Sequence, residues 1–282
     1  MPGDVNSAWA TEMSAAYDEY LVPAVFRPYA EDLAARVARQ APREMLELAA
    51  GTGVLTRAIM ARLPGAHVTA TDLNVAMVHI GSGQVPMAKW RQADAMQLPF
   101  GDTSFDLVAC QFGVMFFPDR PVAYAEVARV LRPGGYFLFN CWGPLATHDV
   151  ESTVMAALAE SFPDDPPRFL TRVPHGYHDP NRIVADLTTA DFGGVHVEAV
   201  ELDCIGRSAA DLARGYCRGT PLRAEIEARG DLAATIPMVA AALERQFGSG
   251  PVVGRMMALV VSACTQAADR EKDSATAPKT AS

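Results

Sequence analysis

Between residues 44 and 141 the sequence alternates short apolar runs with longer stretches of helical periodicity. The short runs at 44–49, 67–71, 89–92, 105–110 and 136–141 are typical of β-strands. Between the first two, Leu55, Ala58 and Ile59 recur at the spacing of one helix face. Strands that alternate with helices in this way form βαβ units and a parallel sheet. Such a sheet is covered on both faces, which explains why its strands are almost uniformly apolar.

The flanking segments have other patterns. Residues 1–42 are predicted to be a helical segment, and residues 43–206 and 251–265 the α/β core. Within the core, an apolar phase slip near Ala199 and Val200 predicts a bulge in a strand over 195–205, and 163–180 is expected to be a loop. A last strand is expected over 256–264, after a helical insertion at 207–250. The polar tail at 266–282 is predicted to be disordered.

Composition and residue spacing narrow the range of partners, cellular locations and metal sites that the chain is expected to have. The net charge is −9, and the chain has no dense run of Lys and Arg, so we expect no nucleic-acid partner. The apolar run at 256–261 is too short to span a bilayer, so no stable membrane insertion is expected. The five cysteines have no metal-type or redox-type spacing and the first residues lack a signal-peptide pattern, which favours the cytoplasm. No His, Cys, Asp or Glu cluster has the spacing of metal ligands, so we expect no metal.

A glycine-rich turn follows the first predicted strand, in the segment Glu47-Leu-Ala-Ala-Gly-Thr-Gly53. Glycines at a strand-to-helix turn allow a tight bend and close approach of a ligand. By itself the turn is equally compatible with an ordinary βα connection. Asp72 lies 19 residues after Gly53, at the end of the second predicted strand, where a carboxylate accepts ribose hydroxyls. Together they indicate a nucleoside ligand, although Asp72 could instead cap the next helix.

The residues around the turn also bear on which nucleoside binds. A dinucleotide places its pyrophosphate at the helix N-terminus. Here Glu47 precedes the glycines, and a carboxylate suits an ammonium group better than a phosphate. S-adenosylmethionine carries an ammonium, a sulfonium, a ribose and an adenine, and no phosphate.

Five motifs in order resemble those of class I S-adenosylmethionine-dependent methyltransferases of the small-molecule type, related to the ubiquinone/menaquinone-biosynthesis enzymes (the methyltransferase type 11 domain). They lie at 47–53, 67–74, 94–100, 105–119 and 129–135, and the resemblance covers roughly residues 9–142. It implies a Rossmann-like α/β sheet, mostly parallel, with seven strands and an antiparallel last strand. The helical insertion would form a cap between the last two strands. One departure is Ala49, where the family usually has glycine, and we expect binding to survive a small backbone shift.

The resemblance also implies roles for individual residues. Asp72 would hold the ribose, and Asp94 would bond the adenine amino group. Tyr17 and Tyr20 would close over S-adenosylmethionine, unless they only pack within a helix. The product would be S-adenosylhomocysteine. The full set of expected cofactor-binding residues is Tyr17, Tyr20, Glu47, Ala49, Gly51, Thr52, Gly53, Asp72, Leu73, Met77, Asp94, Ala95, Met96, Gln111 and Phe112.

The acceptor is expected to be a small molecule methylated on O, N or C, and its identity has no motif. A general base is needed only if the acceptor loses a proton. His148, His175 and His178 are candidates for that base, although histidines in loops are more often solvent-exposed bystanders. The 207–250 insertion is predicted to be a lid, or else a homodimer interface. As a lid it would offer substrate contacts from Arg214, Tyr216, Arg218 and Arg223.

Two other functions remain open at this point. A nicotinamide-dependent oxidoreductase would use a related sheet, but it requires a dinucleotide-type glycine triplet that is not evident here. A non-catalytic S-adenosylmethionine-binding protein would keep Asp72 and have a blocked acceptor pocket.

Overall fold

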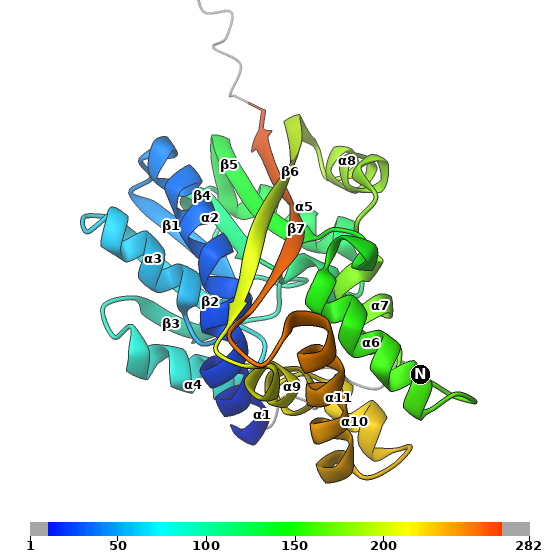
Figure 1. Cartoon of the computed structure of the whole chain (residues 1–282). Helices are drawn as coiled ribbons and strands as arrows, with labels where there is room; N and C mark the ends of the chain where they lie inside the picture. Colours follow the sequence, from blue (N-terminus) through cyan, green and yellow to red (C-terminus); the bar gives the residue numbers. More distant parts are fainter. Residues whose placement is uncertain (1–10, 267–282) are drawn as a thin grey trace, which may run out of the picture.

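Seven strands form one sheet in the computed structural model, which describes residues 11–266 (Figure 1). Their order across the sheet is β3-β2-β1-β4-β5-β7-β6. The pairs from β3 to β5 are parallel, and β7 is antiparallel to both of its neighbours. This confirms the predicted fold class. The strands are β1 (Glu44–Leu48), β2 (His67–Asp72), β3 (Lys89–Gln92), β4 (Phe105–Gln111), β5 (Leu131–Trp142), β6 (Phe192–Gly206) and β7 (Val252–Thr265).

Alternate residues of the central strands enter two hydrophobic cores, one on each face of the sheet. On one face, Met45 and Leu107 pack with Leu33 of α2 and Ile59 of α3. On the other face, β1, β4 and β5 pack against α5. The period of two residues along a strand produces this division. The helices that flank these strands are α2 (Arg27–Gln40), α3 (Val54–Arg62), α4 (Val75–Gln84) and α5 (Arg120–Val130).

The N-terminal segment is helical, and part of it is unusually wide. Helix α1 (Thr11–Ala16) continues into the π-helix η1 (Tyr17–Phe26) and then into α2. Pro23 lies within η1, where it lacks the amide hydrogen that a regular helix needs. The Gln111 side-chain amide donates a hydrogen bond to the Phe26 carbonyl oxygen at 3.0 Å. The wide turn therefore lies against the end of β4, as short π-helical segments often do at functional sites.

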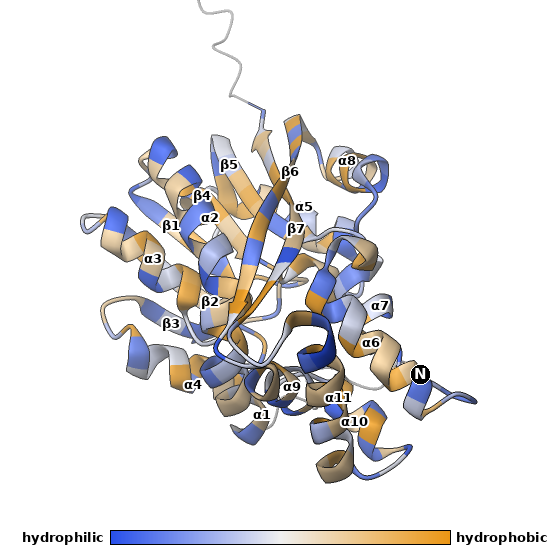
Figure 2. Ribbon diagram, in the orientation of Figure 1, coloured by the Kyte–Doolittle hydropathy of each residue, from blue (hydrophilic) through white to orange (hydrophobic). Residues whose placement is uncertain are grey.

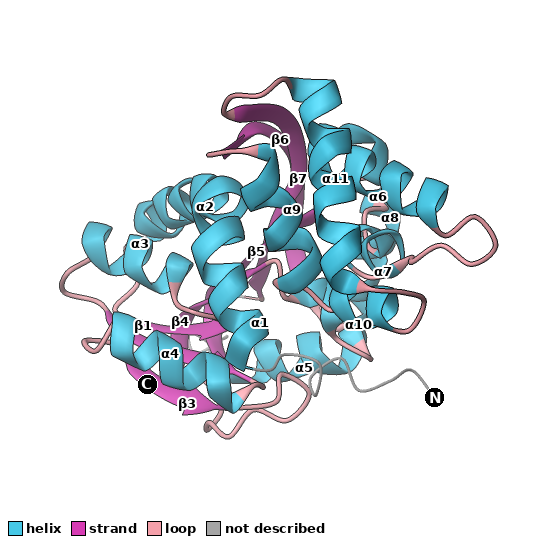
Figure 3. Cartoon of the chain, turned by 60° about the horizontal axis from the view of Figure 1, so that its bottom comes forward, coloured by secondary structure: helices cyan, strands magenta, loops and turns pink. Residues whose placement is uncertain are grey.

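Most helices from the second half of the chain gather at one end of the sheet (Figures 1 and 3). Three of them, α9 (Ala209–Arg218), α10 (Leu222–Glu227) and α11 (Leu232–Phe247), connect β6 to β7. Helix α9 packs against η1, and α11 packs against both α9 and α6. The remaining elements are η2 (Val114–Phe116), η3 (Leu145–Thr147), α6 (Asp149–Ser161), α7 (Phe169–Arg172), η4 (Pro174–Gly176) and α8 (Pro180–Thr189).

Three expectations from sequence need correction. Residues 163–180 contain α7 and η4, so they are not only a loop. The last strand begins at Val252, because residues 252–255 continue the ladder with β6. The predicted bulge near Ala199 and Val200 is wrong, since both residues pair regularly with β7. The register shifts instead between Gly193 and His196, beside Gly194 with φ of +58°.

The apolar phase slip in β6 has a different cause from a bulge. Val195 and Val197 are partly buried at odd positions, whereas Val200, Leu202 and Cys204 are the more buried residues farther along. Successive strand residues point to opposite faces, so the covered face changes along β6. Helix α8 contacts this strand, as do η1 and α2. Figure 2 shows the mixed hydropathy of β6, as expected for an edge strand.

Two parts of the chain lie outside this description. They are residues 1–10 of the predicted N-terminal segment and residues 267–282 of the predicted disordered tail. Within residues 11–266, none of the helices is both long enough and apolar enough to cross a bilayer.

A buried tyrosine links α2 to the two antiparallel strands, and its removal tests that link. The Tyr29 hydroxyl lies 3.0 Å from the Val200 carbonyl oxygen and 3.1 Å from that of Met256. Tyr29→Phe keeps the ring and removes the hydroxyl, so we expect the free energy of unfolding in urea to fall by about 1 kcal/mol. Tyr136→Phe, at an exposed tyrosine, is the matched control. Equal losses in the two variants would contradict this role of the Tyr29 hydroxyl.

Candidate functional site

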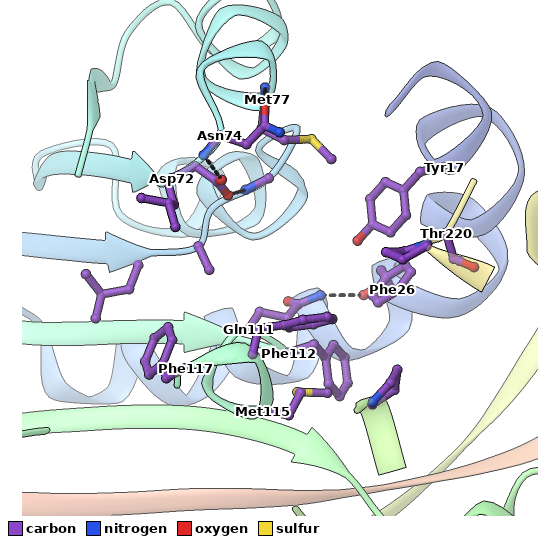
Figure 4. A pocket seen from close by; sticks show the side chains of 18 of the residues that line it. Tyr17, Phe26, Asp72, Asn74, Met77, Gln111, Phe112, Met115, Phe117 and Thr220 are labelled. Carbon is purple, nitrogen blue, oxygen red and sulfur yellow. Dashed lines mark hydrogen bonds between the residues drawn. The ribbon is translucent and has the colours of Figure 1, made fainter. Parts of the chain in front are cut away.

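A cavity of about 240 Å³ lies at the carboxyl ends of β1, β2 and β4, and Figure 4 shows part of its wall. Ligands of open α/β sheets bind at this edge because the loops that follow the strands converge there. Tyr17 and Phe26 of η1 form one side of the cavity, facing Asp72 and Met77 on the other. The N-terminal helical segment therefore covers the ends of the strands.

The turn after β1 has the conformation that its glycines predict. Gly51 and Gly53 have φ of +56° and +89°, a region that favours glycine. Ala49 has φ of +51°, so the one departure from the family pattern occupies a strained position. Its methyl group packs where a side chain on Gly113 would lie, since a Cβ added to Gly113 would be 2.5 Å from it. A glycine at position 113 thus makes room for the alanine at position 49.

Asp72 connects the loops that follow β1 and β2. Its two carboxylate oxygens accept hydrogen bonds from the Gly51 amide at 2.9 Å and the Asn74 amide at 2.8 Å. Burial raises the pKa of Asp72, and the two amide donors oppose that rise. The Asn74 side chain, not that of Asp72, caps α4 by accepting from the amides of Ala76 and Met77. Each Asp72 oxygen keeps a further lone pair, and the residue lines the cavity.

A smaller hollow of about 30 Å³ adjoins the turn and contains two hydrogen-bond acceptors. The pKa of Glu47 is raised to about 8, mainly by burial and also by the charge of Asp72, while the hydrogen bond that the Thr56 hydroxyl donates to Oε2 at 2.7 Å opposes the rise. Gln111 Oε1 is also buried, and within residues 11–266 it has no hydrogen-bond partner. A buried carboxyl group, which a bound cation would favour in its charged form, and a buried unpaired carbonyl oxygen form a site suited to a cationic donor and unsuited to a phosphate.

The structure brings together most of the residues that the sequence indicated. Glu47 and Thr52 line only the smaller hollow. Tyr20, Gly53 and Met96 line neither space: the Tyr20 ring lies 5.8 Å from the Arg207 guanidinium, and Gly53 packs against Trp90. The predicted residues that line the large cavity are Tyr17, Ala49, Gly51, Asp72, Leu73, Met77, Asp94, Ala95, Gln111 and Phe112.

The far end of the cavity is mostly apolar, and the sequence indicated little of it. Glu151 of α6, together with Tyr216 and Thr220 from the α9 region, provides polar groups there. Arg214, Arg218 and Arg223, which were expected to contact substrate along with Tyr216, do not line the cavity. They lie on the outer surface of the insertion, where Arg214 pairs with Asp211 and Arg223 with Glu227. The apolar residues at this end include Phe116, Trp142, Phe169, Leu170, Pro174 and Pro221.

The three candidate histidines have different environments. His178 is exposed, whereas His148 and His175 are buried beside Glu151, and none of the three lines the cavity. His148 Nδ1 lies 2.8 Å and His175 Nε2 3.0 Å from the same oxygen of Glu151, Oε2. The Tyr216 hydroxyl donates to Oε1 at 3.1 Å. Although Glu151 is buried, its histidine neighbours hold its pKa well below the usual range.

The cluster of His148, Glu151 and His175 corrects an expectation from sequence. Their side-chain ligand atoms lie within 4.8 Å of one another, so residues able to bind a metal do gather here. The prediction of no such cluster failed because His175 lies 24 residues beyond Glu151, and only folding brings η4 against α6. The signal available in the sequence was the three-residue spacing between His148, the residue just before α6, and Glu151 in the first turn of that helix.

Comparison with known families agrees with the motifs. Residues 46–139 match the family model described as "Methyltransferase domain". The chain is 40% identical over 104 residues to a ubiquinone/menaquinone biosynthesis C-methyltransferase of Paracoccus denitrificans, an alignment that covers 34% of this chain and 42% of that protein. It is 35% identical to a malonyl-[acyl-carrier protein] O-methyltransferase of Halorhodospira halophila, over 48% of this chain and 46% of that protein. The chain thus spans less than half the length of these two relatives.

Solved structures share the fold over most of the chain. The YcgJ protein of Bacillus subtilis superposes with a TM-score of 0.55 at 18% identity, covering 84% of this chain and 98% of that one. A phosphoethanolamine N-methyltransferase of Haemonchus contortus superposes with a TM-score of 0.53 at 18% identity, covering 83% and 52%. The likeness therefore extends beyond residues 46–139 to the antiparallel strands.

The protonation of Glu47 predicts a dependence of stability on pH. Its pKa is 4.5 when unfolded and about 8 when folded, so between these values the folded chain holds more protons and loses stability as pH rises. Glu47→Gln does not titrate at this position and can still accept from Thr56. We expect its unfolding free energy to exceed that of the wild type by on the order of 2 kcal/mol at pH 8.5, with the difference shrinking toward pH 5.

Urea denaturation at several pH values measures this difference. Glu160→Gln removes an exposed carboxylate of α6 and serves as the control, for which we expect no such trend. A Glu47→Gln variant whose stability stays parallel to that of the wild type at every pH would contradict the assignment of a raised pKa to Glu47.

Proposed function

We propose that this chain, whose residues 46–139 are a methyltransferase domain, transfers the methyl group of S-adenosylmethionine to an O, N or C atom of a small molecule. The observation that carries the proposal is the pairing of a ribose-type carboxylate, Asp72, with a buried acceptor pair, Glu47 and Gln111, at one edge of the sheet. The cofactor would supply an electrophilic methyl group on a sulfonium. The chain's own residues would bind it, orient it and exclude water.

The residues at the sheet edge fit this cofactor. The unpaired Gln111 Oε1 and the Glu47 carboxyl group would accept hydrogen bonds from its ammonium group. The free lone pairs of Asp72 would accept from the ribose hydroxyls. Leu73, Met77, Asp94 and Ala95 would surround the adenine.

The aromatic part of the cavity wall favours a positively charged ligand beside it. Phe112 and Trp142 are stacked with ring centroids 3.6 Å apart, and Phe26 packs on both. Aromatic faces attract cations, so this wall would favour a sulfonium. Tyr17 lines both spaces and would cover the bound cofactor. Next to it, Asp18 accepts a hydrogen bond from the Thr52 hydroxyl at 2.6 Å, which ties η1 to the glycine turn.

The acceptor would be a small molecule with an apolar body. It would occupy the end of the cavity between Trp142, Phe169 and Leu170, where Glu151 and Tyr216 are the nearby polar groups. Transfer from a cofactor held against the same cavity gains mainly from proximity and from the exclusion of water. Because His148 and His175 lie behind Glu151, either would act on an acceptor through that carboxylate.

Replacing Asp72 tests the cofactor site. We expect Asp72→Ala to weaken binding of S-adenosylhomocysteine by about 10- to 100-fold in calorimetry, because charge-assisted hydrogen bonds worth about 1–3 kcal/mol are lost. Asp164→Ala removes an exposed carboxylate in the loop after α6 and should leave the affinity unchanged. Circular dichroism of both variants checks that the fold is retained. Unchanged affinity in Asp72→Ala would mean that the ribose is held elsewhere.

The same calorimetry separates the candidate functions. Binding of S-adenosylhomocysteine without binding of NAD supports the proposal, and the reverse supports a nicotinamide-dependent oxidoreductase. A non-catalytic binding protein would bind S-adenosylhomocysteine but transfer no labelled methyl group to any member of a panel of small acceptors.

The location of the protein and its oligomeric state stay predictions. The five unpaired cysteines support a cytoplasmic location, and a homodimer is the predicted assembly.

A further inference from the structure

We propose that His148, Glu151 and His175 bind a divalent transition-metal ion, with Zn²⁺ as the best match, at the acceptor end of the cavity. Two imidazole nitrogens and one carboxylate oxygen are a ligand set that zinc uses where it keeps one position open. Only the role of the ion toward the acceptor depends on the proposed methyltransferase function.

The tautomers of both histidines are set by backbone carbonyl groups. His148 Nε2 lies 2.9 Å from the Met257 carbonyl oxygen, and His175 Nδ1 lies 2.7 Å from that of Gly143. A carbonyl oxygen only accepts, so each of these nitrogens carries the hydrogen. In the neutral rings, His148 Nδ1 and His175 Nε2 therefore each carry a lone pair, and both atoms face Glu151 Oε2. Histidine ligands of metals are typically fixed by such a bond on the other ring nitrogen.

Three buried acceptors that face one another require a positive charge between them. One proton on His175 Nε2 would satisfy the contact with Glu151. His148 Nδ1 is buried 2.8 Å from the same oxygen, so that contact would need a second proton, on His148. A single metal ion would satisfy all three atoms at once, in place of two protons.

The three atoms are close enough for one ion to join them after a rearrangement of the side chains. Ligands about 2.1 Å from a zinc ion lie roughly 3.0–3.4 Å apart. The nitrogen-to-oxygen distances of 2.8 and 3.0 Å are close to that range, whereas the three atoms together lie within 4.8 Å of one another, so the two histidine nitrogens would have to move toward each other on binding. The Tyr216 hydroxyl holds the other carboxylate oxygen, Oε1, which leaves Oε2 as the ligand.

The cavity gives the ion a route in and the acceptor a route to it. Glu151 and Tyr216 line the cavity, whereas His148 and His175 lie behind them at 1–2% exposure. The Trp142 ring meets that of His148 edge-to-face, with centroids 5.2 Å apart, and Trp142 also lines the cavity. An open coordination position would therefore face the acceptor, and it would take an oxygen or nitrogen donor such as a hydroxyl group.

Metal binding to the full-length, tag-free protein tests the proposal without cofactor or acceptor. After treatment with a chelator, the protein is titrated with Co²⁺, whose visible absorption reports coordination, and Zn²⁺ is then added as competitor. We expect one ion per chain, displaced by Zn²⁺. Glu151→Gln keeps the size of the side chain but removes a proposed ligand. Loss of a residue that only holds a ligand in place costs about 10- to 100-fold in metal affinity, so this variant should lose more than that. His148→Ala should behave alike.

Two further variants keep the test decisive. Tyr216→Phe removes only the hydrogen bond to Oε1 and should weaken metal binding by about 10- to 100-fold. This variant replaces Glu151→Gln in the test if that variant fails to fold. His79→Ala, at an exposed histidine of α4, is the matched control and should bind as the wild type does. Absence of stoichiometric binding, or binding that survives in Glu151→Gln and His148→Ala, would overturn the proposal. Neither result depends on the binding of S-adenosylhomocysteine, which is measured separately. Failure of the metal proposal is therefore distinguishable from failure of the proposed function.

Discussion

The hydrogen bonds from the Gly51 and Asn74 amides to Asp72 hold together the loops that follow β1 and β2. The glycine turn lies at the end of one strand and the start of α4 at the end of the next, and the Asp72 carboxylate is shared between them. A buried carboxylate without such donors would be costly, so the two loops are stabilised in one arrangement. The cavity wall on this side depends on that arrangement.

A second buried carboxylate organises the opposite end of the cavity. Glu151 contacts His148 at the start of α6, His175 in η4 and Tyr216 in α9. These elements come from before β6 and from the insertion after it. One side chain thus connects the helical insertion to the helices that precede β6, and the loss of any partner would leave buried polar atoms unsatisfied. The insertion is therefore part of the cavity wall, whether or not it also moves as a lid.

The two ends of the cavity also differ in how much of each lies within the segment that matches the family model. The family model ends at residue 139, just before Trp142 and most of the other residues at the apolar end of the cavity. The part of the wall around Asp72 thus lies in the segment that relatives share, whereas Glu151, His175 and Tyr216 lie beyond the matched segment. Specificity for an acceptor is expected to come from this second part, because functional sites vary on a common fold.

The sequence by itself determined the parallel sheet, the glycine turn and the position of Asp72. These features depend on residues close together along the chain, where strand and helix periodicity and the conformational freedom of glycine act locally. The tertiary structure decided which face of β6 is covered, because α8, η1 and α2 all pack against that strand. It also decided that Gly113 makes room for Ala49, and that His175 meets Glu151 across 24 residues. Contacts of that kind depend on packing between distant elements, and no local pattern in the sequence specifies them.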